Sequence, residues 1–263
     1  RVKHPSKIVA VGDDIEAVTG ATVSLQGLTE AIQVACHRAA EVANIPVEAR
    51  ATPRITLGVP ELILLLLFGI GFLAYAPAVH RYRRTLQWIG LGLGLTLLGI
   101  WLNGPISLIH INALLMGYWP QWQTHLYWYL LVLGVLLPIV LTGRNVYCSH
   151  VCPLGAVQQA LGTVSANRLH VPRRLHRALR WAQRVLAWLA VFSALLARNP
   201  GVMHYEVSGT LFSLNGAIWQ FVLLAFVLIA SLALMRPWCH YLCPMHALTD
   251  FIRLLRGCFR RLD

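Results

Sequence analysis

The feature that most constrains this chain is a long run without charge. From Thr85 to Gly143 the sequence contains no Asp, Glu, Lys or Arg over 59 consecutive positions. A water-soluble domain needs charged side chains on its surface, and about a quarter of its residues are usually charged. In the whole chain charged residues make up 12% and hydrophobic residues 57%. The sequence therefore predicts an integral membrane protein and excludes an ordinary soluble domain.

Apolar segments long enough to cross a bilayer recur after residue 55. A helix needs about 20 predominantly apolar residues for this. We place five such segments at about 59–79, 85–103, 125–143, 181–198 and 217–236. Arg184 interrupts the fourth segment but lies about one turn from its end, where the side chain can reach the headgroups. The predicted fold class is mainly α, with a polytopic helical membrane domain of about five transmembrane helices over residues 55–263.

The net charge of +12 is the kind seen in nucleic-acid-binding proteins, but its placement argues for membrane orientation instead. Of 22 Lys and Arg residues, 6 precede residue 55 and 15 lie in three clusters between or after the apolar segments. The loops at about 104–124 and 199–216 contain Glu206 and no Lys or Arg. Because cytoplasmic loops carry the excess of Lys and Arg, we place the three basic clusters in the cytoplasm and residues 1–54 outside. No nucleic-acid partner is expected.

Four of the six cysteines form two copies of one pattern. The first copy contains Cys148 and Cys152, and the second contains Cys239 and Cys243. Both copies have the form aromatic-C-x-x-aliphatic-C-P-[LM]-x-A and follow an apolar segment, the third and the fifth. The repeat predicts one two-part site with pseudo-symmetric halves.

The chemistry of this pattern favours an iron–sulfur cluster. Four thiolates are the usual cluster ligands, and C-x-x-x-C-P closes the motifs of bacterial ferredoxins. Cytoplasmic thiols are kept reduced, which argues against structural disulfides. A zinc site, small apolar residues without a metal, and two half-sites completed by other ligands stay open as alternatives. Cys36 is expected to be a packed small residue, and a role for Cys258 in the basic tail stays open.

Residues 1–54 are polar and of mixed charge, and they are too few to bury much of a core alone. The helical spacing of Leu28, Ile32, Ala35 and Ala39 predicts one amphipathic helix over about 24–43. We expect this segment to be the C-terminal portion of a larger outer domain. Because the chain opens at Arg1 without an initiator Met, we also expect a fragment or a processed form.

The segment Thr19-Gly20-Ala21-Thr22 precedes this helix. From the residues alone, a capped helix start and a phosphate site at the helix amides are both open. The segment resembles the flavinylation motif D-x-x-[ST]-G-A-T of periplasmic FMN-binding domains, with Glu16 where that family usually has Asp. The resemblance implies a small α+β domain with FMN joined to Thr22 by a flavin transferase.

An outer FMN motif followed by apolar spans with two C-x-x-x-C-P copies resembles the NosR/NirI family of nitrous-oxide and nitrite respiration. The membrane part is also similar to quinol-linked NapH-type proteins. The resemblance implies an electron-transfer protein of the bacterial inner membrane, rather than a stand-alone enzyme. It would link FMN with a cytoplasmic-side 4Fe-4S centre and feed a periplasmic reductase, such as nitrous oxide reductase, or an electron carrier. A redox-sensing regulatory protein and a membrane maturation scaffold are the alternatives.

The histidines at predicted span ends and in loops suggest no haem site, because none lies in the middle of a span. His150 and His240 lie inside the cysteine patterns and are candidates to tune or replace a ligand. His110, His125 and His204 share the predicted outer face, where a quinone or metal contact is a further option. Since the hydrocarbon core is about 30 Å thick, we expect a quinone or a partner's cofactor to bridge the two redox centres.

Overall fold

The structure is a computed structural model that divides into two compact units, residues 1–53 and 54–263. It describes residues 57–120, 122–123, 125–164, 171–202, 205–214 and 216–259, with isolated positions 32, 35, 38, 39 and 42. The isolated positions are helical and fall within the helix predicted over 24–43. The predicted flavin segment lies outside the described residues.

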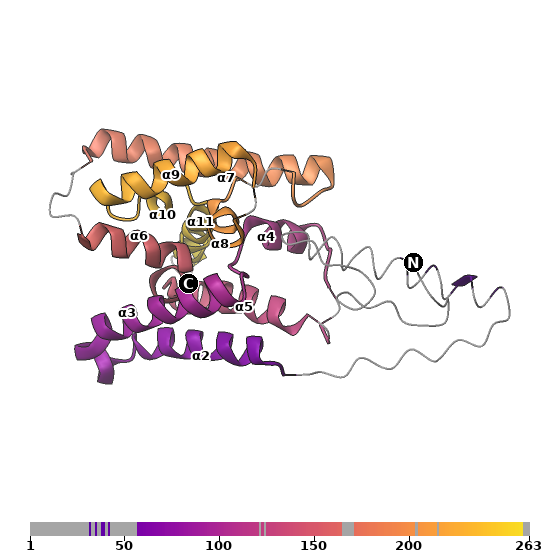
Figure 1. The fold of residues 1–263 in the computed structure, drawn as a ribbon, viewed down its shortest axis with the longest axis horizontal. Helices are drawn as coiled ribbons and strands as arrows, with labels where there is room; N and C mark the ends of the chain where they lie inside the picture. The colour runs from indigo at the N-terminus through magenta and orange to yellow at the C-terminus, as the bar shows by residue number, and fades with distance from the viewer. Residues whose placement is uncertain are drawn as a thin grey trace. The chain divides into compact units, whose positions relative to one another are not determined.

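The described part of the second unit is helical and contains no strand (Figure 1). Its first half comprises α2 (Val59–Leu73), the 3-10 helix η1 (Pro77–Tyr82), α3 (Arg83–Leu93), the π-helical η2 (Gly94–Trp101), α4 (Leu108–Leu115), α5 (Leu126–Thr142), the π-helical η3 (Tyr147–Val151) and α6 (Pro153–Val164). Its second half comprises α7 (Arg173–Ala197), α8 (Val207–Ser213), α9 (Ile218–Ala233), α10 (Pro237–Tyr241) and α11 (Pro244–Phe259). The prediction of a mainly α chain is confirmed for these residues.

Each of the five predicted spans coincides with helical structure. Among the described helices only α7 is long and apolar enough by itself to cross a membrane, and α8 with α9 adds a second if this bent pair is one broken span. Helices α2 and α5 are apolar but shorter. The 17 residues of α5 rise about 26 Å, and the helix ends at Gly143 with φ 72°. The number of spans therefore stays a prediction.

The two cysteine patterns belong to two larger repeats within the second unit. Helices α3 to α6 form the first repeat and α7 to α11 the second. Each repeat runs from a long helix through a short helix, an apolar helix and a short cysteine-bearing helix to a closing helix. Packing between the repeats is reciprocal, because α6 contacts α9 and α11 contacts α5. Within the repeats, η3 and α6 pack on α3 and η2, as α10 and α11 pack on α7. Helix α2 lies beside α3 and α5, outside the repeat (Figure 1).

Two clusters of buried apolar side chains hold this unit together. The larger contains Leu64 and Leu131 from α2 and α5, and the smaller contains Leu154 from α6. Cys152 and Cys243 pack against both clusters. The cysteine segments therefore lie where the two apolar cores meet.

Candidate metal centre

The second cysteine of each pattern, here called the closing cysteine, lies between a short helix and a longer one. Cys152 precedes α6 and Cys243 precedes α11, and both helices begin with Pro, whose missing N–H costs nothing at a first helical position. The backbone N–H of Cys152 donates to the carbonyl of Tyr147 at 2.8 Å, and that of Cys243 donates to the carbonyl of Trp238 at 2.8 Å. Equal spacing in the sequence therefore gives the same backbone hydrogen bond, although η3 is π-helical and α10 is α-helical.

The first turns of α6 and α11 direct backbone amides at these sulfur atoms. Gly155 donates its N–H to Sγ of Cys152 at 3.4 Å. The backbone amide of His246 makes the matching contact with Cys243. Amides at a helix start, together with the helix dipole, stabilise a thiolate. These amides lower the pKa of both closing cysteines and so oppose part of the effect of burial.

The four thiols share one electrostatic environment. Cys243 interacts with Cys239, Cys148 and Cys152, and Cys239 interacts with Cys152 and Cys148. Burial raises the pKa of all four thiols, that of Cys148 to about 12. Nearby thiols raise the pKa of three of them further, Cys152 being the exception. Burial thus favours the protonated form of each thiol, and Cys148, Cys152 and Cys243 pack against the same apolar cluster.

The thiols do not form a closed ligand shell as they stand. Among the described residues no three His, Cys, Asp or Glu side chains converge closely enough to hold a metal ion. Protonated thiols have no bond that draws them together, and a metal binds cysteine only as the thiolate. The donor set nevertheless suits an iron–sulfur cluster, since it combines four cysteines from two matched segments with the N-termini of two helices.

Arg236 connects the two repeats beside the thiols. Its backbone is left-handed, with φ 51°, an uncommon conformation for a residue with a side chain. Nη1 donates to the carbonyl of Cys148 at 2.9 Å, and Nη2 donates to Oε1 of Gln159 on α6. The guanidinium charge lowers the pKa of Cys148, Cys152 and Cys239, although burial has the larger effect. Arg236 therefore supplies positive charge where thiolates would form.

Asn145 holds the matching position in the first repeat, three residues before its first cysteine. Its Oδ1 accepts the backbone N–H of Cys148 at 3.0 Å, and its Nδ2 donates to Oγ1 of Thr249 on α11 at 3.2 Å. Each repeat thus reaches across to the closing helix of the other.

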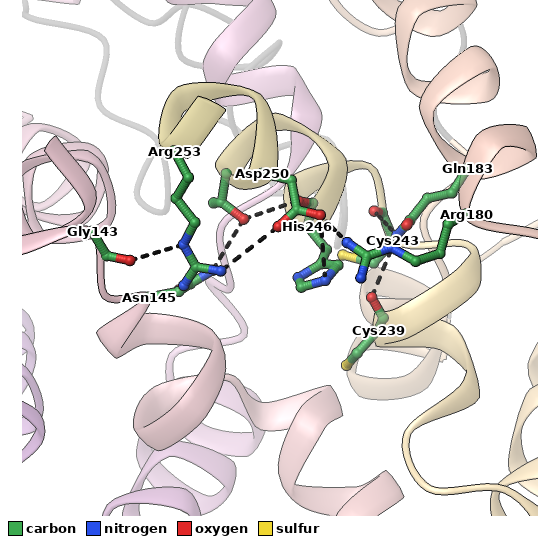
Figure 2. A network of polar contacts seen from close by, with 10 residues as sticks. Gly143, Asn145, Arg180, Gln183, Cys239, Cys243, His246, Asp250 and Arg253 are labelled. Atoms are coloured by element: carbon green, nitrogen blue, oxygen red, sulfur yellow. Dashed lines mark hydrogen bonds and ion pairs between the residues drawn. The ribbon is translucent and has the colours of Figure 1, made fainter. Parts of the chain in front are cut away.

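The second cysteine segment is fixed from the side of α7 (Figure 2). Nε2 of the buried Gln183 donates to the carbonyl of Cys243 at 2.8 Å and to that of Cys239 at 3.4 Å. A buried amide that bonds both cysteine carbonyls fixes the backbone of this segment rather than its sulfur atoms.

An ion-pair network follows on α11, centred on Asp250 (Figure 2). Asp250 accepts a hydrogen bond from Arg180 of α7 and lies 3.6 Å from Nη1 of Arg253. Nε of Arg253 donates to the carbonyl of Gly143 at 2.9 Å. The network therefore joins α11 to α7 and to the end of α5.

The histidines of the cysteine patterns have other contacts. The buried ring of His150 packs edge-on against Tyr75 with centroids 5.1 Å apart, and the exposed His240 lies 5.9 Å from the ring of His246. In the described part of the chain neither belongs to a group that could hold a metal. Burial lowers the pKa of His110 to about 4, so this residue is neutral at pH 7. His204 lies outside the described residues.

Two loops predicted to face outward contact the cysteine segments, which the sequence did not reveal. The backbone N–H of Ile106 donates to the hydroxyl of Tyr147 at 3.1 Å. The ring of Tyr205 packs against Trp238 with centroids 6.1 Å apart. In the sequence, the one sign that these loops have a buried contact is Glu206, the single charged residue in them. Each of these two loops thus contacts one of the cysteine segments.

Comparison with known proteins agrees with this geometry. Residues 124–172 and 216–261 match a sequence family described as a 4Fe-4S binding domain. Protein NirI of Paracoccus denitrificans is 32% identical over 203 residues, which cover 70% of this chain and 29% of NirI. The regulatory protein NosR of Pseudomonas aeruginosa is 30% identical over 210 residues, which cover 73% of this chain and 29% of NosR. The chain belongs to the NosR/NirI-type family.

This membership confirms the resemblance seen in the motifs and supports an iron–sulfur protein of electron-transfer or regulatory type. Each matched segment of the NosR/NirI-type chain contains one C-x-x-x-C-P copy. The methylamine utilization ferredoxin-type protein MauN of Paracoccus denitrificans is 33% identical over 116 residues, covering 41% of this chain and 38% of MauN. The chain spans about 29% of the length of NirI and of NosR. No solved structure matches it.

Proposed function

We propose that this chain is a membrane electron-transfer protein that holds a 4Fe-4S cluster between its two repeats. The proposed ligands are Cys148, Cys152, Cys239 and Cys243. The observation that carries the proposal is that two segments matched to one 4Fe-4S family meet in the fold, where Cys152 of one and Cys243 of the other pack against the same two apolar clusters.

The surroundings of the thiols suit this role. When bound, a cluster supplies one-electron oxidation and reduction. The four cysteines would hold it as thiolates, so its binding releases protons. Arg236 would offset part of the negative charge, while Gln183 and Asn145 fix the two backbone segments.

We further propose an outer flavin and a respiratory partner. FMN would be attached to Thr22 by a flavin transferase acting on the motif that contains Thr19, Gly20, Ala21 and Glu16. The chain would span the bacterial inner membrane five times, with residues 1–54 in the periplasm. Electrons would pass to a periplasmic reductase such as nitrous oxide reductase, or to an electron carrier, with quinol as a candidate donor.

The decisive experiment is quantification of iron, acid-labile sulfide and flavin in the purified protein, with EPR of the reduced form. We expect about four iron and four sulfide per chain and the signal of a reduced 4Fe-4S cluster. Zinc in place of iron, or no metal after anaerobic purification, would refute the cluster. A Thr22→Ala variant should lose the flavin fluorescence of the denatured protein and keep its iron. If that fluorescence persists, Thr22 is not the acceptor.

Orientation is tested by an impermeant thiol reagent in spheroplasts. We expect Cys36 to be labelled under conditions that expose it, and Cys258 to react only after the membrane is opened. The opposite pattern would overturn the proposed topology.

A regulatory role is the second candidate, favoured by the name of the relative NosR, a regulatory protein. Turnover separates the two functions. An electron conduit sustains reduction of a partner as long as a donor is supplied, whereas a sensor takes up electrons once and then stops.

A further inference from the structure

Several side chains near the cysteine site have a buried polar atom without a hydrogen-bond partner among the described residues, including Nε2 of His150 and Nε of Arg180. Two of them come from outside the cysteine patterns and their ion-pair network: Tyr205, whose hydroxyl is unpaired, and Gln158, whose amide nitrogen and oxygen are both unpaired. A buried polar group without a partner costs about 1–3 kcal/mol. The two unpaired donors, the hydroxyl of Tyr205 and Nε2 of Gln158, indicate that the site contains an acceptor for them.

Tyr205 reaches the site from the loop before α8. It packs against the smaller apolar cluster, as do Cys152 and Cys243. Its ring contacts Trp238, the residue before Cys239. Its hydroxyl also interacts electrostatically with Cys243. The unpaired O–H therefore lies within the environment of the thiols.

Gln158 reaches the same site from α6. It lies three residues after Gly155, and residues three apart share one face of a helix. A Cβ atom added at Gly155 would lie 3.6 Å from Sγ of Cys152, so this face of α6 is the one turned toward the thiol. The side chain of Gln158 is fully buried. Gln158 thus lies one helical turn beyond Gly155 and six residues after Cys152, on the face of α6 that begins at the thiol.

We propose that the hydroxyl of Tyr205 and the amide N–H of Gln158 are hydrogen-bond donors to the sulfur atoms of the bound cluster and raise its reduction potential. This inference rests on the proposed function, because the acceptors are the thiolate and sulfide sulfurs of the cluster. Reduction adds negative charge to these sulfurs, so a donor stabilises the reduced form more than the oxidised form. Hydrogen bonds to cluster sulfurs are one of the factors that set the potential.

The test is a potentiometric titration of the purified holoprotein followed by EPR, with Tyr205→Phe and Gln158→Met. Both substitutions keep the approximate size of the side chain and remove the donor. For each we expect unchanged iron content and a reduced-to-oxidised ratio about tenfold lower at a given solution potential, which equals ~59 mV for a one-electron couple. Tyr129→Phe is the matched control, because the hydroxyl of Tyr129 already donates to the carbonyl of Pro120 at 2.7 Å. Its potential should equal that of the wild type.

The outcomes separate this inference from the proposed function. A wild-type protein without an EPR-active cluster refutes the proposed function. A cluster whose potential is the same in the wild type, Tyr205→Phe and Gln158→Met refutes the donor role and leaves the cluster assignment intact. If Tyr205→Phe fails to assemble, Gln158→Met decides by the same criterion. An equal shift in Tyr129→Phe would also refute the inference, because the effect would then not depend on an unpaired donor.

Discussion

The two cysteine segments share one backbone hydrogen bond, from the second cysteine to the residue before the first, but their surroundings differ. In the first, Tyr147, His150 and Val151 are buried in the larger apolar cluster or beside it. In the second, the closing helix α11 carries an ion-pair network on one side and exposed apolar side chains, such as Phe251 and Leu254, on another. Both segments are anchored in the apolar cores, and what differs is that α11 also presents ion pairs and apolar side chains at the surface.

The helices that precede the two segments also hold them differently. Helix α3 and its continuation η2 approach the first segment through glycines. A Cβ atom at Gly90 would lie 2.7 Å from the carbonyl oxygen of His150, and one at Gly94 would clash with the carbonyl of Val151. Helix α7 reaches the second segment through the long side chain of Gln183, as Gln87 of α3 reaches the carbonyl of Ser149 at 3.2 Å. Hydrogen bonds therefore fix both halves, and the first half adds close backbone packing at glycines.

The largest effect is expected where the two halves act as one. We predict that Cys→Ala at any of Cys148, Cys152, Cys239 and Cys243 removes most of the bound iron, because each variant leaves three thiolates for a cluster that needs four. The measurement is iron per protein after anaerobic purification, with Cys36→Ala as the control that keeps its iron. If only the variants of one segment lose iron, the segments are two separate half-sites.

The next effect tests the glycine contact of the first half. We predict that Gly94→Ala destabilises the protein by about 3 kcal/mol, because the added methyl group meets the backbone of Val151, which cannot move without displacing η3. Gly92→Ala is the control, since nothing lies within 4 Å of its added Cβ. A helix prefers Ala to Gly, so this variant should be up to about 1 kcal/mol more stable than the wild type. Equal thermal unfolding of both variants in detergent would show that close packing does not fix the first half.

A smaller effect tests the ion pairs of the second half. We predict that Asp250→Asn costs about 2 kcal/mol, mainly through the loss of the charge that Arg180 pairs with (Figure 2). Arg253 is more exposed and contributes less, because solvent screens its interaction. The loss should shrink at high salt, as measured by thermal unfolding. Glu61→Gln, in the first half, is the control, because Glu61 forms no ion pair among the described residues.

The sequence predicted what depends on spacing along the chain. Equal C-x-x-x-C-P patterns predicted two matched halves, which agree with the repeated order of helices, and the apolar segments predicted helices where the structure has them. The roles of Arg236 and Gln183 could not be predicted, because each side chain contacts a residue more than 50 positions away. In the sequence, Arg236 indicated only membrane orientation. Its left-handed backbone, which turns it toward the first repeat, has no signature in a residue other than glycine or asparagine.

The contacts between these two loops and the cysteine segments could not be predicted from the sequence either. The positive-inside rule predicts the loops on the outer face of the membrane and the cysteines on the inner face. The hydrogen bond from Ile106 to Tyr147 and the packing of Tyr205 on Trp238 join them. These contacts are set by how far each loop folds back into the helical unit, which hydropathy does not encode.

The smallest predicted effect concerns the contact between the starts of the short helices α4 and α8. The N-terminus of α4 receives a carboxylate from the other half, because Oε1 of Glu206 accepts the backbone N–H of Leu108 at 2.6 Å. Burial raises the pKa of Glu206 from 4.5 to about 7, and this hydrogen bond opposes the shift only in part. The folded protein therefore keeps a proton on Glu206 that the unfolded chain releases near pH 4.5.

It follows that the free energy of unfolding should fall as the pH rises from about 4.5 to 7 and become level above that range, because the unfolded state binds fewer protons within it. We expect a total change on the order of 1 kcal/mol, since Glu206 is partly accessible to solvent. Glu206→Gln keeps an acceptor for Leu108 but cannot ionise, so the variant should lack this slope. Thermal unfolding of both proteins across this pH range measures the difference, and the subtraction removes the titration of all other groups. If the stability of both proteins depends on pH in the same way, the pKa of Glu206 is not raised in the folded protein. The contact between the halves at α4 then depends on the hydrogen bond and not on the charge.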